Sequence, residues 1–213
     1  MLTVHHLGIS QSERIVWLCE ELEIPYELIR HERDPTTKLA PATYKALHPF
    51  GTAPVITDGD LTLGESGAIM DYIISKYGDG RLRIPSDSPE YADYLFWFHF
   101  ANASFMASIM TSIVISMAGL EEGSPVAENL NKRKNKAFAM VEARLGEADY
   151  FSGATFSAAD IIMLFPLTTM RAFMPMDLTP FPNIRAYLAR IAARPAYQRA
   201  MKKAEPDMPP MTS

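Results

Sequence analysis

The sequence predicts an α/β domain over about the first third of the chain, followed by an all-helical domain. Three observations predict this fold class. Strand-like segments alternate with helical stripes up to Tyr77, glycine and proline punctuate Gly78–Pro89, and no convincing strand pattern follows. We therefore expect a first domain over residues 1–78, a linker over 79–88 and a helical domain over 89–213.

The first domain is predicted to begin with a strand, a helix and a second strand. Leu2–Leu7 has the pattern of a short strand that ends at Gly8. A single apolar stripe runs through Ser12–Leu22, which predicts a helix. Tyr26–Ile29 follows a proline and is predicted as the second strand.

The rest of this domain is predicted to contain two helices and a hairpin. Pro41–Leu47 is a short helix, because proline is well tolerated in a first turn. Val55–Asp58 and Leu61–Leu63, joined by Gly59 and Asp60, have the pattern of a hairpin. A helix over Glu65–Tyr77 completes the order β-α-β-α-β-β-α, which is that of a thioredoxin-like domain.

The second domain is predicted to be entirely helical. Its expected helices are Glu90 to about Met117, about Pro125 to Gly146, Ala158 to about Phe173, Asn183–Ala193 and Ala196–Ala204. Ser157–Asp160 is a capping-box variant that starts the third of these helices. Pro206–Ser213 is expected to be a loosely held tail.

Charge and cysteine content exclude several classes of function. A net charge of −5 argues against a nucleic-acid surface, which needs basic residues to neutralise phosphates. Cys19 is the only cysteine, so neither an intrachain disulfide nor a CxxC redox motif is available. No signal peptide and no apolar run of membrane-spanning length is evident, and no His/Cys cluster has metal-ligand spacing. We expect a cytoplasmic protein without a metal, a membrane or a nucleic-acid partner.

Three short segments lie at junctions between predicted strands and helices or turns: Gly8–Arg14, Pro49–Ile56 and Gly64–Ile69. Their order and spacing resemble the glutathione-binding half of a glutathione S-transferase, and the helical remainder extends the resemblance over nearly the whole chain. The spacing from Ser10 to Arg14 is similar to that of several serine-type classes. Leu18–Leu22 continues the pattern of a bacterial or fungal member.

Ser10 is the candidate for activating the glutathione thiol. The thiolate is the nucleophile, yet a free thiol is only about 3% ionised at pH 7. Lowering its pKa by roughly two units requires about 2.7 kcal/mol, and a hydrogen bond to a charged group supplies about 1.5–3 kcal/mol. One well-aimed hydroxyl is therefore nearly sufficient, and Ser10 lies between a predicted strand and a predicted helix.

Other residues near Ser10 are alternatives for this role. Ser12 directly precedes Glu13 and the apolar stripe, which makes it the better N-cap, although it remains an alternative for the hydroxyl. No cysteine or tyrosine occupies either position, which disfavours the cysteine-type members of the family. His5 and His6 could approach the site, but histidines at the end of a strand are more often structural.

The resemblance also implies how the rest of glutathione is bound. A cis bond before Pro54 turns the backbone of Ala53 toward the cysteinyl part, with Thr52 beside it. Ser66, at a helix start, binds the α-carboxylate of the γ-glutamyl group, and Glu65 binds its ammonium. Lys38 is the candidate for the glycine carboxylate, with a solvated surface lysine as the alternative.

Aromatic residues crowd the first helix of the second domain. Phe98, Phe105 and Ser108 share a face that is the candidate border of an apolar pocket, and core packing is the alternative for each. Tyr72, Tyr77 and the aromatic band after Tyr91 offer more apolar surface than one interdomain contact needs. Together with the resemblance, they predict a homodimer.

These features predict a glutathione S-transferase that joins the glutathione thiolate to a hydrophobic electrophile, with hydroperoxide reduction as a second activity. Glutathione is a co-substrate here, and no cofactor is implied. The alternative is a non-catalytic glutathione-transferase-like binding or regulatory module. A thiol–disulfide enzyme or lyase is disfavoured, because the chain lacks the cysteine at the required position.

Overall fold

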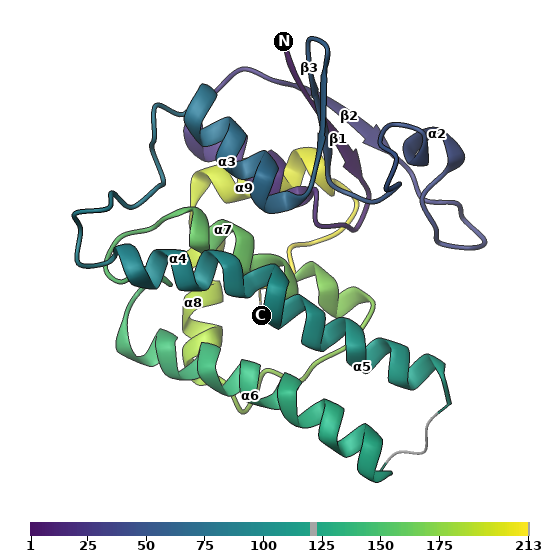
Figure 1. The fold of residues 1–213 in the computed structure, drawn as a ribbon, viewed down its shortest axis with the longest axis vertical. Coiled ribbons are helices and arrows are strands. Elements are labelled where there is room, and N and C mark those ends of the chain that lie inside the picture. The colour runs from purple at the N-terminus through teal and green to yellow at the C-terminus, as the bar shows by residue number, and fades with distance from the viewer. Residues whose placement is uncertain (120–122, 213) are drawn as a thin grey trace.

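The structure is a computed structural model that describes residues 1–119 and 123–212. Its N-terminal part is a mixed sheet with helices against it, and its second part is a layered group of helices (Figure 1). This arrangement confirms the predicted fold class. Ser213 and residues 120–122, which fall in the predicted tail and helical domain, lie outside the described residues.

The N-terminal domain has the predicted β-α-β-α-β-β-α order. Its elements are β1 (Leu2–Leu7), α1 (Glu13–Leu22), β2 (Glu27–His31), α2 (Ala42–Lys45), β3 (Val55–Asp58), β4 (Leu61–Gly64) and α3 (Ser66–Lys76). The strand order is β2-β1-β3-β4, with β1 parallel to β2 and antiparallel to β3. β1 is the most buried strand, because every residue in it is shielded from solvent. The carboxyl end of β1, from which the loop to α1 departs, therefore starts inside the molecule.

The helical domain follows a stretch without helix or strand between Lys76 and Tyr91. Its elements are α4 (Tyr91–Phe100), η1 (Ala101–Met106), α5 (Ala107–Met117), α6 (Pro125–Glu147), α7 (Ala158–Leu164), η2 (Phe165–Leu167), η3 (Thr169–Ala172), α8 (Pro182–Ala192) and α9 (Pro195–Ala204). The last helix, α9, returns to the N-terminal domain and packs on α1 (Figure 1). Glu205, just after α9, therefore lies at the loop that follows β1.

The predicted helix over Glu90–Met117 is not regular. It is continuous, but Ala101–Met106 forms a π-helix, in which the hydrogen bonds span one residue more than in an α-helix. This extra residue rotates the side chains that follow. Met106 and Met110 consequently line the space between the two domains.

The predicted helix over Ala158–Phe173 is wrong in its second half. Its α-helical part ends at Leu164, and two short 3₁₀ turns follow. Pro166 has no N–H to donate to a preceding carbonyl, so the α-helical ladder cannot continue through it. The predicted capping box at the start is confirmed. The Ser157 side chain accepts from the backbone of Asp160, and the Asp160 side chain accepts from the backbone N–H of Ser157.

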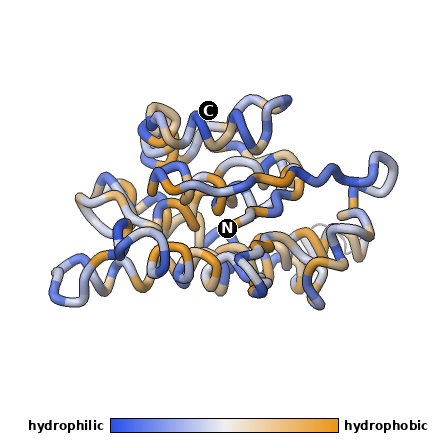
Figure 2. Tube along the Cα trace, turned by 90° about the horizontal axis from the view of Figure 1, so that it is seen from above, coloured by the Kyte–Doolittle hydropathy of each residue, from blue (hydrophilic) through white to orange (hydrophobic). Residues whose placement is uncertain are grey.

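Apolar residues from both domains form one continuous core. Figure 2 shows hydrophobic stretches through the middle of the molecule and hydrophilic stretches at several of its outer turns. The run Tyr91–Ile115 is long and apolar enough to cross a membrane by length and composition alone, unlike the expectation from sequence. Core helices satisfy the same criterion, and Tyr94, Trp97 and Phe105 of this run are packed in the core.

Candidate active site

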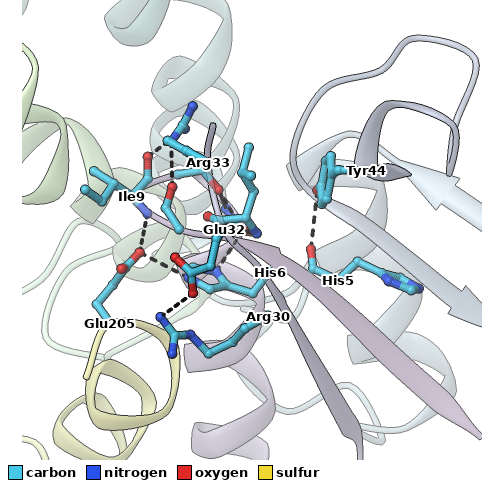
Figure 3. Close-up of polar contacts among 12 residues, drawn as sticks. His5, His6, Ile9, Arg30, Glu32, Arg33, Tyr44 and Glu205 are labelled. Carbon is cyan, nitrogen blue, oxygen red and sulfur yellow. Dashed lines mark hydrogen bonds and ion pairs between the residues drawn. The ribbon is translucent and has the colours of Figure 1, made fainter. Parts of the chain in front are cut away.

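The loop after β1 is held in place from two sides. Ile9 has a left-handed backbone with φ of 52°, and its N–H donates to the carboxylate of Glu205. The guanidinium of Arg33 donates to the carbonyl oxygens of Gly8, at 2.7 Å, and of Ile9, at 2.9 Å. Figure 3 shows Arg33 and Glu205 on opposite sides of Ile9. These contacts fix the position of the next residue, Ser10.

The side chain of Ser10 lies at the wall of a cavity of about 450 Å³ between the two domains. Ser10 as a whole is 6% exposed. Its Oγ lies 2.7 Å from Ser12 Oγ and accepts a hydrogen bond from Ser12 N–H at 3.2 Å. A hydroxyl with this placement can meet a ligand in the cavity while its other side is bonded to the protein.

Ser12 lies behind Ser10 and does not line this cavity. It occupies the predicted N-cap position of α1, but its side chain makes no capping hydrogen bond. Its Oγ instead bonds His6 Nδ1 at 2.8 Å and accepts from Leu7 N–H at 3.1 Å. His6 Nε2 in turn lies 3.1 Å from Glu205 Oε1. The histidine therefore connects the loop to the end of α9.

The cavity has an apolar wall formed by the helical domain. It is lined there by Met106, Met110, Ile113, Phe165, Met170 and Phe173. The predicted pocket residues Phe98, Phe105 and Ser108 lie in the interior instead. Phe105 packs edge-on against Phe138, and the Ser108 hydroxyl donates to the Phe105 carbonyl oxygen. The π-helix sets this division, because it turns Met106 and Met110 to the cavity and Phe105 to the core.

A polar cleft continues from this cavity toward α3. Thr52 and Ala53 line both, and Pro54, Glu65 and Ser66 line the polar part. The peptide bond between Ala53 and Pro54 is cis, as predicted. Glu65 has φ of 70° and makes no side-chain cap to α3, whose first helical residue is the buried Ser66. The start of α3 thus faces the cleft without an internal capping group.

Two amide side chains in the polar cleft were not predicted from the sequence. The buried guanidinium of Arg14 donates to Gln11 Oε1 at 2.7 Å and to Asn102 Oδ1 at 2.9 Å. Because both amide oxygens accept from Arg14, both amide nitrogens remain as donors, and both residues line the cleft. Asn102 comes from the π-helix, which brings the helical domain to the polar cleft.

The structure separates Lys38 from the cavity that Ser10 lines. Lys38 lies in a turn after β2, with φ of 60°, and borders a different hollow with Arg30 and Asp207. Lys45 on α2 lines the Ser10 cavity instead. The sequence interpretation of Lys38 therefore does not fit the geometry, and Lys45 is the lysine placed to meet an anion there.

The arrangement is suited to an elongated ligand with charged ends and a central thiol. Donor and acceptor groups at α3 match an amino-acid zwitterion, Ser10 matches the centre, and Lys45 matches an anion. The apolar wall leaves room for a second, hydrophobic molecule beside the centre. Among residues 1–119 and 123–212, no group of three or more His, Cys, Asp or Glu is placed to hold a metal ion.

The fold and this cleft define a class of protein in which a thioredoxin-like domain and a helical domain enclose a cleft with a polar and an apolar part. Residues 10–76 match the family model of the glutathione S-transferase N-terminal domain, and residues 91–195 match that of the C-terminal domain. Glutathione S-transferase 3 of Schizosaccharomyces pombe is 33% identical over 218 residues, covering 96% of this chain and 88% of that protein. Glutathione S-transferase GstB of Escherichia coli K12 is 30% identical over 197 residues, covering 90% of this chain and 93% of that protein.

A solved structure gives the same result. The crystal structure of a glutathione S-transferase from Actinobacillus pleuropneumoniae superposes with a TM-score of 0.86 at 32% identity, covering 96% of this chain and 93% of that chain. The chain therefore belongs to the glutathione S-transferase family, and it is a glutathione transferase.

Proposed function

We propose that this enzyme is a serine-type glutathione transferase in which Ser10 stabilises the glutathione thiolate for attack on a hydrophobic electrophile. The observation that carries this proposal is the position of the Ser10 hydroxyl at the wall of the cavity, where the polar cleft meets the apolar wall. A hydrogen bond from this hydroxyl to the thiolate supplies about 1.5–3 kcal/mol, which lowers the thiol pKa by roughly one to two units.

Glutathione would lie along the polar cleft with its γ-glutamyl end at α3. Glu65 supplies a carboxylate for the ammonium group, and Ser66 with the first N–H groups of α3 supplies donors for the α-carboxylate. The backbone of Ala53 pairs with the cysteinyl part, beside Thr52. Lys45, in place of Lys38, attracts the glycine carboxylate.

The electrophile would bind against the apolar wall. Three of its six side chains are flexible methionines, Met106, Met110 and Met170, and the other three are Ile113, Phe165 and Phe173. Methionine adapts to ligands of different shape. This composition supports a broad range of hydrophobic electrophiles, with aryl halides, epoxides and isothiocyanates as one class and hydroperoxides as a second.

We also propose that the enzyme works as a cytoplasmic homodimer in detoxification. Tyr72 and Tyr77, which suggested the dimer from the sequence, donate to Asp58 within the chain. The exposed apolar side chains include two aromatic ones that lie outside the apolar wall, Phe50, 72% exposed, and Phe96, 46% exposed. These two aromatic residues now carry the dimer proposal.

The direct test of function is a panel of aryl halides, hydroperoxides, isothiocyanates and epoxides, each assayed with glutathione. The expected result is turnover that saturates with glutathione and is greatest with hydrophobic electrophiles. Ile113→Ala, in the apolar wall and outside the polar cleft, should raise the KM for the electrophile and leave the KM for glutathione unchanged. Retention on immobilised glutathione without turnover of any of these electrophiles would contradict conjugation as the function.

A further inference from the structure

A buried chain of hydrogen bonds leads from Ser10 through Ser12 and His6 to Glu205. Its successive distances are 2.7 Å between the two serine oxygens, 2.8 Å to His6 Nδ1, and 3.1 Å from His6 Nε2 to Glu205 Oε1. Ser12 and His6 have no exposed surface, and Glu205 is 6% exposed. Figure 3 shows Glu205 reaching from the end of α9 toward His6. None of the last three residues touches the cavity of Ser10.

The proton positions at His6 follow from its two neighbours. Glu205 Oε1 already accepts the N–H of Ile9 and faces His6 Nε2, so a neutral His6 carries its proton on Nε2 and donates it to Glu205. His6 Nδ1 is then an acceptor. The only donor within reach of it is the Ser12 hydroxyl among the described residues, so Ser12 donates to His6.

The donation from Ser12 to His6 determines which hydrogen bonds Ser10 can make when no ligand is bound. Ser12 Oγ accepts from Leu7 N–H and has one lone pair left, which accepts the Ser10 hydroxyl proton. Ser10 Oγ accepts from Ser12 N–H and keeps one lone pair for the cavity. With neutral His6, Ser10 is therefore an acceptor toward a thiol.

A proton on His6 Nδ1 reverses the chain. The imidazolium then donates to Ser12 Oγ, and the Ser12 hydroxyl donates to Ser10 Oγ. Both lone pairs of Ser10 Oγ are now used, by Ser12 O–H and Ser12 N–H. The Ser10 hydroxyl proton is free to point into the cavity, where a thiolate would accept it.

We propose that Ser12, His6 and Glu205 form a proton relay that transfers the thiol proton of glutathione from Ser10 to His6 Nδ1. The thiol S–H bond breaks and a bond to Ser10 Oγ forms, while the Ser10 proton moves to Ser12 Oγ and the Ser12 proton moves to Nδ1. The products are a thiolate that accepts from Ser10 and an imidazolium paired with Glu205. After the thiolate reacts, the reverse transfer returns the proton to the leaving group or to water in the cavity.

The charges around His6 support this assignment. Glu205 is the only carboxylate hydrogen-bonded to it among the described residues. Arg33, from the segment after β2, and Glu13, from α1, act on Glu205 with opposite signs. Arg30 and Glu32 on the same side pair with each other at 3.2 Å. Burial, followed by the charge of His6, lowers the pKa of His31, which disfavours a second positive charge beside the imidazolium.

The relay rests on the proposed role of Ser10, and one experiment separates the two. Thiolate formation on glutathione binding is followed by ultraviolet absorbance, and proton release is measured by calorimetry in buffers of different ionisation enthalpy. The wild-type enzyme is expected to form thiolate while releasing close to zero protons per thiolate at pH 7. Nitrogen-15 NMR should show His6 changing from a neutral ring with Nε2–H to an imidazolium in the same titration.

Ser12→Ala breaks the chain, so each thiolate formed should then release about one proton to the buffer. Glu205→Gln keeps an acceptor for Ile9 but removes the charge opposite His6, and should raise the apparent pKa of the bound thiol by about one unit. His5→Gln is the matched control, because the His5 side chain bonds those of His31 and Thr57 and takes no part in the hydrogen bonds from Ser10 to Glu205. His5→Gln should behave as the wild type.

The outcomes distinguish the relay from the proposed function. One proton released per thiolate in the wild type, or a His6 ring that does not change, overturns the relay and leaves the role of Ser10 intact. Absence of thiolate in the wild type overturns both.

Discussion

Each end of glutathione is proposed to meet a residue that contributes to binding and not to the reaction. Glu65 and Ser66 lie at the start of α3, in the polar part of the cleft, away from the apolar wall. Contacts to a remote part of a substrate are equally strong in the ground state and the transition state. Their loss should therefore change affinity more than turnover.

We expect Glu65→Gln and Ser66→Ala each to weaken glutathione binding by roughly 1.5–3 kcal/mol, which is about tenfold or more. Turnover at saturating glutathione should change little. Calorimetry and steady-state kinetics measure the two effects. Asp60→Asn is a charge-matched control, because Asp60 is exposed in the turn between β3 and β4. Wild-type affinity in both variants would remove these residues from the site.

Lys45 and Lys38 can be compared directly, since both are exposed lysines before Gly51 and only Lys45 lines the Ser10 cavity. Lys45→Met should raise the Kd for glutathione up to about fivefold, which corresponds to about 1 kcal/mol for an exposed charge pair. The effect should shrink at high salt. Lys38→Met should leave the Kd unchanged, and the opposite ranking would restore Lys38 as the glycine-carboxylate partner.

The site residues that the sequence could indicate lie at junctions between elements. Ser10, Pro54 and Ser66 each follow or precede a strand or helix in a recognisable local pattern, and the structure places all three around connected cavities. Lys45 and Asn102 had no such pattern. Their position depends on how α2 and the π-helix pack, which is a tertiary property that spacing along the chain does not encode.

At the scale of the elements, the beginning of α1 contains a buried carboxyl group, Glu13. Glu13 is fully buried, and this burial raises its pKa to about 8 from an ordinary value of 4.5. The folded protein therefore keeps a proton on Glu13 at pH values where the unfolded chain has lost it. Because the folded state binds more protons than the unfolded chain, stability falls as pH rises from about 4.5 to about 8.

We expect the free energy of unfolding to fall by up to about 1.4 kcal/mol per pH unit within that window because of Glu13. Glu13→Gln has a neutral side chain of the same shape, so it should flatten the profile and be more stable than the wild type at pH 8. Urea unfolding at pH 6 and pH 8, at one protein concentration, measures this. Glu23→Gln, an exposed change just after the same helix, is the control. If the free energy of unfolding of Glu13→Gln changes with pH as it does in the wild type, Glu13 is already ionised in the folded protein and the prediction is contradicted.

The order of the elements was predictable, and their irregularities were less so. Strand and helix patterns placed β1, the hairpin and α3 to within a few residues. The break at Pro166 had a visible cause, because proline lacks the N–H that a helix interior needs. The π-helix at Ala101–Met106 had none, since its residues are as compatible with a regular helix and only packing distinguishes the two.

For the whole molecule, we predict a homodimer. Phe50 precedes the cis proline and Phe96 lies on α4, and both expose aromatic surface that a partner subunit would cover. Light scattering at micromolar concentration should give a mass near twice that of one 23.8 kDa chain. Phe50→Ser should shift the mass toward one chain, with Leu39→Ser, another exposed apolar residue, as the control. A wild-type mass near one chain would contradict the dimer.

The central claim is that Ser10 lowers the pKa of glutathione bound in the cleft. It is tested most directly by titrating the ultraviolet absorbance of the bound thiolate against pH in the wild type and in Ser10→Ala, with both saturated by glutathione. The account predicts that the apparent thiol pKa lies below its free value of about 8.5 in the wild type and rises by about one to two units in Ser10→Ala, while the Kd changes only a few-fold. An unchanged pKa in Ser10→Ala would contradict it.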